Sequence, residues 1–142
     1  MTINRTGSAI WQGGIKDGKG TISTESGALD GHPYGFAMRF EDVKGTNPEE
    51  LIGAAHAGCF TMALSGILGR EGLTAERMDT KARVSMEKTA DGFEITAVHL
   101  TLEGRVPGCD AAKFQELADK AKAGCPVSKL LKAQVTLEAT LV

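Results

Sequence analysis

A long and almost uninterrupted apolar segment at residues 48–69 is the feature that most restricts how this chain can fold. The residues at its N-terminal edge have the signals of a helix start. Asn47 can cap the helix, Pro48 suits the first helical position, and Glu50 can complete a capping box. The glycine-containing stretch from Gly69 is typical of a helix end. We therefore expect one helix over this segment, about 30 Å long.

The middle of this segment, AAHAGCF at residues 54–60, is small and apolar on nearly every helical face. A helix of this kind is expected to be buried on all sides, and its small residues allow another backbone to come close. His56, Thr61 and Ser65 interrupt the apolar run. The pattern therefore indicates a buried helix of a folded domain rather than a membrane span.

Short strands and further helices are expected on either side of the long helix. Residues 8–26 predict two short strands around a glycine-rich connection. Residues 34–41 predict a third strand, with Phe36, Met38 and Phe40 on one face and Arg39 on the other. Later in the chain we expect a hairpin of strands at 80–89 and 93–106, a helix at 110–123 capped by Asp110, a short helix that begins at Cys125-Pro126, and a last strand at 133–142.

This order of elements predicts an α+β fold, and 142 residues suit a single domain over residues 1–142. The net charge of −2 argues against nucleic acid or an anionic membrane surface as a partner. The N-terminal stretch lacks an apolar core of signal-peptide length. We therefore expect a cytoplasmic protein, in a compartment where free thiols stay reduced.

Three cysteines, Cys59, Cys109 and Cys125, cannot form a fully paired disulfide framework. Cys125 precedes Pro126 and should be the N-cap of a helix, where unpaired N–H groups and the helix dipole lower the pKa of a thiol. It could also be an ordinary turn cysteine. Cys59 lies among alanines in the long helix, where a cysteine is usually an inert core residue. Cys109 falls in an expected exposed turn and receives no role.

A reactive thiolate needs a cation nearby, and Arg39 is a candidate. Glu49 or Glu50 could hold that arginine by a bidentate ion pair, although both could simply be first-turn acids of the helix. Glu49 and Cys59 are ten residues apart on one helix, hence about 15 Å along its axis. If both serve one site, the glutamate must come from an antiparallel copy of the helix in a second subunit. We therefore expect a two-fold dimer with composite sites.

His56 precedes Cys59 by one helical turn. It could act as a base or provide half of a metal site, but a histidine satisfied within the core is the simpler interpretation. His32 and His99 have no spacing that would complete a metal site. We expect neither a metal nor a cofactor. Cys125-x-x-Ser128 resembles half of a redox motif, without the βαβ pattern that usually surrounds one.

Three segments closely resemble the osmotically inducible protein C (OsmC) family. They are YGF at residues 34–36, GTNPEELIGAAHAGCF at 45–60 and AGCPVSK at 123–129. The likeness extends over essentially the whole chain, including Gly18-Lys19-Gly20 and Pro107-Gly108. The two cysteine motifs, in this order and register, are highly specific. The family's related organic hydroperoxide resistance branch carries its arginine nearer the N-terminus, so Arg39 favours the OsmC branch.

The resemblance implies a peroxidase that acts in oxidative and osmotic stress defence. It would reduce organic hydroperoxides and, less well, hydrogen peroxide. Its fold would be an intertwined homodimer with antiparallel β-sheets around long central helices. By similarity Cys59 is the peroxidatic thiol and Cys125 the resolving thiol, joined as a disulfide in turnover, while Arg39 and Glu49 polarise the site. The family's usual reductant is a small dithiol of the lipoyl type. A non-enzymatic binding module and a thiol–disulfide exchanger are the alternatives from the residues alone.

Overall fold

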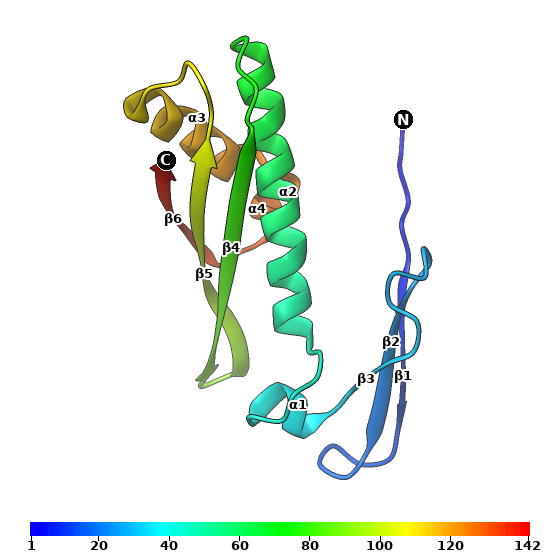
Figure 1. Cartoon of the computed structure of the whole chain (residues 1–142). Helices are drawn as coiled ribbons and strands as arrows, with labels where there is room; N and C mark the ends of the chain where they lie inside the picture. Colours follow the sequence, from blue (N-terminus) through cyan, green and yellow to red (C-terminus); the bar gives the residue numbers. More distant parts are fainter. The chain divides into compact units, whose positions relative to one another are not determined.

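The computed structural model describes residues 1–142, and the fold is α+β as predicted. The chain divides into two compact units, Met1–Leu51 and Ile52–Val142. The first unit holds a three-stranded antiparallel sheet in the order β1-β2-β3 (Figure 1). Its elements are β1 (Gly7–Gln12), β2 (Lys19–Thr24), β3 (His32–Tyr34), α1 (Phe36–Phe40) and the first residues of α2 (Pro48–Arg70). The two strands expected within residues 8–26 are thus confirmed.

The strand expected at residues 34–41 is wrong, because the extended chain ends at Tyr34 and α1 follows. Gly35 is fully extended and separates the two elements. Phe36 and Phe40 fit alternate positions of a strand, but they are also four residues apart and so share a helical face. Their rings pack with centroids 4.9 Å apart.

The start of α2 has one of the two hydrogen bonds of the predicted capping box. The backbone N–H of Glu50 donates to Asn47 Oδ1 over 2.8 Å, so Asn47 caps the helix as expected. The Glu50 carboxylate does not close a reciprocal box with Asn47. It accepts a hydrogen bond of 3.1 Å from the Thr46 hydroxyl instead. The helix extends to Arg70, one residue beyond the predicted end.

The second unit packs the rest of α2 with a second three-stranded sheet, and α2 runs alongside β4 in Figure 1. This sheet has the order β4-β5-β6. Its elements are β4 (Arg77–Thr89), β5 (Gly92–Arg105) and β6 (Gln134–Leu141), with α3 (Ala111–Gly124) and α4 (Pro126–Leu130) before β6. The predicted hairpin, helices and last strand are therefore present. β6 lies parallel to β5 within a fold expected to be antiparallel, because α3 and α4 form a crossover connection.

Within the second unit α2 buries one face, which includes His56, Phe60, Leu64 and Leu68. The expectation of burial on all sides is wrong for the single chain, where Met62 on another face is 79% exposed. The second unit supplies one sheet, and a sheet covers one face of a helix. By length and composition alone α2 could cross a membrane, although its buried stripe packs into the core with Val98, Leu100 and Leu102 of β5.

We expect Gly104→Ala to destabilise the protein by about 1–3 kcal/mol, because an added Cβ would overlap the buried ring of Phe114. Gly69→Ala is the matched control. A Cβ at Gly69 in α2 meets no atom within 4 Å, and alanine is the better helix former by up to about 1 kcal/mol. Urea unfolding at equilibrium measures both changes. Equal stability of the two variants would contradict this packing.

Candidate active site

Cys125 is the N-cap of α4, as the sequence predicted. Pro126 occupies the first turn, and the backbone N–H of Ser128 donates to Cys125 Sγ over 3.3 Å. The Cys125 thiol donates in turn to the Ser128 hydroxyl, with 3.2 Å between Sγ and Oγ. The side chain is fully buried. The start of α4 therefore holds this sulfur in one orientation.

Cys59 and Cys125 lie together, although their spacing in the sequence carries no signal of contact. Cys59 is half-buried on α2, packs against the core cluster that contains Cys125, and interacts with the Cys125 side chain. Burial raises the pKa of the Cys59 thiol, the nearby Cys125 raises it further, and the Val127 backbone N–H lowers it. No cation contributes to the pKa of Cys59 in the single chain. The single chain therefore does not contain the cation that was expected to activate the Cys59 thiol.

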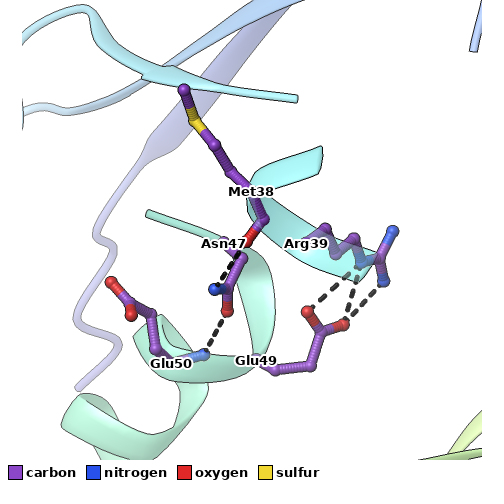
Figure 2. Close-up of polar contacts among 5 residues, drawn as sticks. All are labelled: Met38, Arg39, Asn47, Glu49 and Glu50. Atoms are coloured by element: carbon purple, nitrogen blue, oxygen red, sulfur yellow. Dashed lines mark hydrogen bonds and ion pairs between the residues drawn. The ribbon is translucent and has the colours of Figure 1, made fainter. Parts of the chain in front are cut away.

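Arg39 and Glu49 form the ion pair that the sequence left open between Glu49 and Glu50. Arg39 Nη2 and Nε lie 2.7 Å and 3.1 Å from Glu49 Oε1, and Nε lies 3.2 Å from Oε2 (Figure 2). The Glu49 side chain is 13% exposed and that of Arg39 37%. A two-point pair of this kind fixes the orientation of the guanidinium plane as well as its position.

Asn47 connects the two helices that carry this pair. Its side-chain oxygen caps α2, and its side-chain nitrogen donates to the Met38 carbonyl of α1 over 3.3 Å (Figure 2). One side chain thus ties α1 to the first turn of α2. Sequence reasoning recognised the cap but missed the bridge, because a strand at Met38 offered no such partner.

A cavity of about 230 Å³ adjoins Arg39 in the first unit. Aromatic and aliphatic side chains dominate its lining, namely Trp11, Ile15, Tyr34, Phe36 and Phe40. The Arg39 guanidinium lies 5.2 Å from the centre of the Phe40 ring. The cavity therefore combines apolar walls with one cationic group, a combination suited to a ligand with an apolar body and a polar end.

His56 is completely buried, and only one of its ring nitrogens has a partner. Its Nε2 lies 2.7 Å from Ser128 Oγ, whereas Nδ1 has no hydrogen bond. Burial lowers the pKa of the imidazole. The interpretation of His56 as a satisfied core histidine is thus wrong for Nδ1. In the sequence, Ser128 was considered only as part of an incomplete redox motif with Cys125. Its place three residues after an N-cap cysteine was the available signal, because that position faces the cap.

The remaining cysteine, Cys109, also packs against this hydrophobic core, and its thiol donates to the Asp110 carbonyl over 3.5 Å. Cys109 is half-buried before α3, and both burial and the charge of Asp110 raise the pKa of its thiol. No group of three or more His, Cys, Asp and Glu side chains in the chain is arranged to hold a metal ion. The two groupings that carry candidate chemistry are therefore Cys59 with Cys125, His56 and Ser128, and Arg39 with Glu49.

The lowered pKa of His56 predicts how stability depends on pH. Below about pH 6.5 the unfolded chain binds a proton on this imidazole, while the folded chain does not until its lower pKa is reached. The free energy of unfolding should therefore fall as the pH drops from 7 toward 5. Chemical denaturation across this range measures the slope. A His56→Gln protein should lose this contribution, and an unchanged slope would contradict a neutral buried His56.

Comparison with known proteins shows the family of this chain. Residues 41–140 match the family described as OsmC-like protein. The chain is 59% identical to peroxiredoxin OsmC of Escherichia coli over 138 residues, which cover 97% of this chain and 96% of the relative. It is 33% identical to an organic hydroperoxide resistance protein of Xanthomonas axonopodis pv. citri over 98 residues, 68% of this chain and 67% of that one. The crystal structure of OhrB, an organic hydroperoxide resistance protein of Bacillus subtilis, matches with a TM-score of 0.68 and 27% identity over 96% of this chain and 98% of that one. The chain belongs to the OsmC family.

Proposed function

We propose that this protein is a cysteine-based peroxidase that reduces organic hydroperoxides in stress defence. Cys59 is the thiol that reacts with the peroxide, and Cys125 is the thiol that resolves the product. The observation that carries the proposal is the shared place of the two sulfurs at the start of α4, where the Ser128 N–H binds Cys125 Sγ and the Cys59 thiol interacts with the Cys125 side chain. The relatives named as a peroxiredoxin and as organic hydroperoxide resistance proteins support the same reaction.

The reaction has three steps. The Cys59 thiolate attacks the distal peroxide oxygen, the O–O bond breaks, and the alkoxide leaves as an alcohol after taking up a proton. Cys59 is then a sulfenic acid. Cys125 attacks the Cys59 sulfur, water leaves, and a Cys59–Cys125 disulfide forms. A small dithiol of the lipoyl type reduces that disulfide by exchange and becomes a disulfide itself.

The activating cation comes from a second copy of the chain. Arg39 is held by Glu49, and Glu49 begins the helix that carries Cys59 ten residues later, about 15 Å along the axis. An antiparallel copy of α2 in a homodimer would bring the partner's Arg39 and Glu49 toward Cys59. The exposed Met62 and the small residues around Cys59 are suited to such packing.

The aromatic cavity beside Arg39 supports a preference for hydroperoxides with an apolar chain over hydrogen peroxide. Arg39 would then bind the peroxide group while the ring-lined cavity takes the apolar chain. The fold is that of OsmC and Ohr proteins, and we place the protein in the cytosol, where dithiol reductants keep thiols reduced. We propose that residues 1–142 form one functional domain, since peroxiredoxin OsmC of Escherichia coli matches 97% of the chain.

We expect Cys59→Ser to abolish peroxide reduction, whereas Cys125→Ser should perform one turnover and retain a sulfenic acid. Mass spectrometry after one equivalent of cumene hydroperoxide measures both outcomes. In the unmodified protein the expected product is a Cys59–Cys125 linkage with Cys109 free. Full turnover by Cys59→Ser would overturn the proposal.

A mixed dimer tests whether Arg39 acts across subunits. Chains with Cys59→Ser and chains with Arg39→Ala should each form inactive dimers, because each lacks one required group. In a mixed dimer, the intact Arg39 of the first chain would complete the site around the intact Cys59 of the second. We expect about half of the unmodified activity per purified mixed dimer, from its one intact site of two. No recovery of activity would show that the two residues act within one chain.

A further inference from the structure

A continuous chain of hydrogen bonds leads from Cys125 to a buried base. The Cys125 thiol donates to Ser128 Oγ over 3.2 Å, and Ser128 Oγ lies 2.7 Å from His56 Nε2. The three residues come from two elements, α2 and α4, that are far apart in the sequence. Both outer members are completely buried, and Ser128 between them is half-buried.

The bond from Cys125 leaves the hydrogen of Ser128 available for His56. The Ser128 oxygen accepts the Cys125 proton, so its own hydrogen can point at His56 Nε2. In the tautomer with the ring proton on Nδ1, which has no partner, Nε2 accepts this hydrogen. A buried polar atom without a partner is costly, and a histidine that served only to fill the core would not require it. His56 is thus oriented as a base at the end of the chain.

We propose that His56 is a positioning residue that takes up the proton of Cys125 through the Ser128 hydroxyl while Cys125 attacks the oxidised Cys59. This role rests on the proposed function, because it assigns the resolving reaction to Cys125. It gives Ser128 a function as the relay between thiol and imidazole, and it concerns the second step of turnover only.

The atoms of the step balance as follows. The Cys125 proton moves to Ser128 Oγ while the Ser128 proton moves to His56 Nε2. The Cys125 sulfur donates its electron pair to the Cys59 sulfur, the S–O bond breaks, and hydroxide leaves and is protonated by solvent to water. When the dithiol later attacks Cys59, Cys125 leaves as a thiolate. It then recovers its proton from the imidazolium by the same path.

The surroundings of His56 suit a proton that is held briefly. The titratable side chains of the hydrophobic core are Cys59, Cys109 and Cys125, and burial is the one cause that acts on the His56 pKa. On β4, Thr80, Ala82 and Val84 alternate with the exposed Lys81 and Arg83, and Lys129 of α4 is exposed. Because no charged group lies beside the ring to stabilise an imidazolium, the proton is returned once Cys125 is a thiolate again.

Single-turnover kinetics test the relay. After one equivalent of cumene hydroperoxide, rapid quenching and intact-mass analysis follow the sulfenic acid and the disulfide as separate products. Ser128→Ala removes the relay hydroxyl but keeps the backbone N–H that binds Cys125. We expect it to form the sulfenic acid at nearly the unmodified rate and the disulfide at least about tenfold more slowly. Ser128→Thr keeps a hydroxyl and should restore disulfide formation.

The pH profile separates a relay from a purely structural role. In the unmodified protein, disulfide formation should vary little with pH above the lowered pKa of His56. In Ser128→Ala and in His56→Gln, whose amide can accept a hydrogen bond but not a proton, the rate should rise about tenfold per pH unit, because the attacking thiolate then forms only by loss of its proton to solvent. Thr61→Val is the control, since it removes another buried hydroxyl contact of α2, to Thr80 on β4, and should leave the rate and its profile unchanged.

Three results would overturn the inference. Disulfide formation at the unmodified rate and pH profile in Ser128→Ala would exclude the hydroxyl as a relay, and the same result in His56→Gln would exclude the imidazole. In both cases the Cys59–Cys125 disulfide would still support the peroxidase. If the unmodified protein forms no such disulfide, the proposed function fails, and the relay fails with it.

Discussion

The cysteine site depends on the backbone N–H groups in the first turn of α4, which have no acceptor within the helix. Pro126 has no N–H, so the donors of this first turn are those of Val127 and Ser128. The Ser128 N–H binds Cys125 Sγ, and the Val127 N–H lowers the pKa of the Cys59 thiol. This places a sulfur from α2 beside a sulfur at the end of α3. The core packing of α2 with β5 and α3 then holds the two elements in register. Neither sulfur would have this environment if the turn before α4 were formed by other residues.

Asn47 has the corresponding place in the first unit. It uses both ends of one amide, the oxygen to cap α2 and the nitrogen to bind α1. Arg39 and Glu49 lie on the two helices that Asn47 connects, so their ion pair follows from the cap. A substitution of Asn47 would therefore make the position of the Arg39 guanidinium less fixed, although Asn47 does not contact that group.

Most of the fold could be predicted because its signals are local. Helix caps at Asn47, Asp110 and Cys125 and the turn at Gly92 depend on neighbouring residues, and the structure has all four. The prediction of a strand at residues 34–41 was wrong because Phe36 and Phe40 fit one face of a strand and one face of a helix equally well. The bridge from Asn47 and the contact of His56 with Ser128 depend on which elements meet in space. No local pattern encodes such contacts, and the pairing of Cys59 with Cys125 came from family resemblance alone.

The separation of thiol and cation explains why the Cys59 pKa is raised in one chain. Burial acts on the thiol wherever α2 packs in its own unit, whereas the opposing charge belongs to a pair fixed at the far end of the same helix. An opposite charge within about 4–6 Å lowers a pKa by about 1–3 units, so a guanidinium beside Cys59 would act against the effect of burial. Under the proposed dimer, assembly would therefore favour the Cys59 thiolate. In the unassembled chain burial acts on this thiol without that opposing charge, which leaves it less open to oxidation by peroxide.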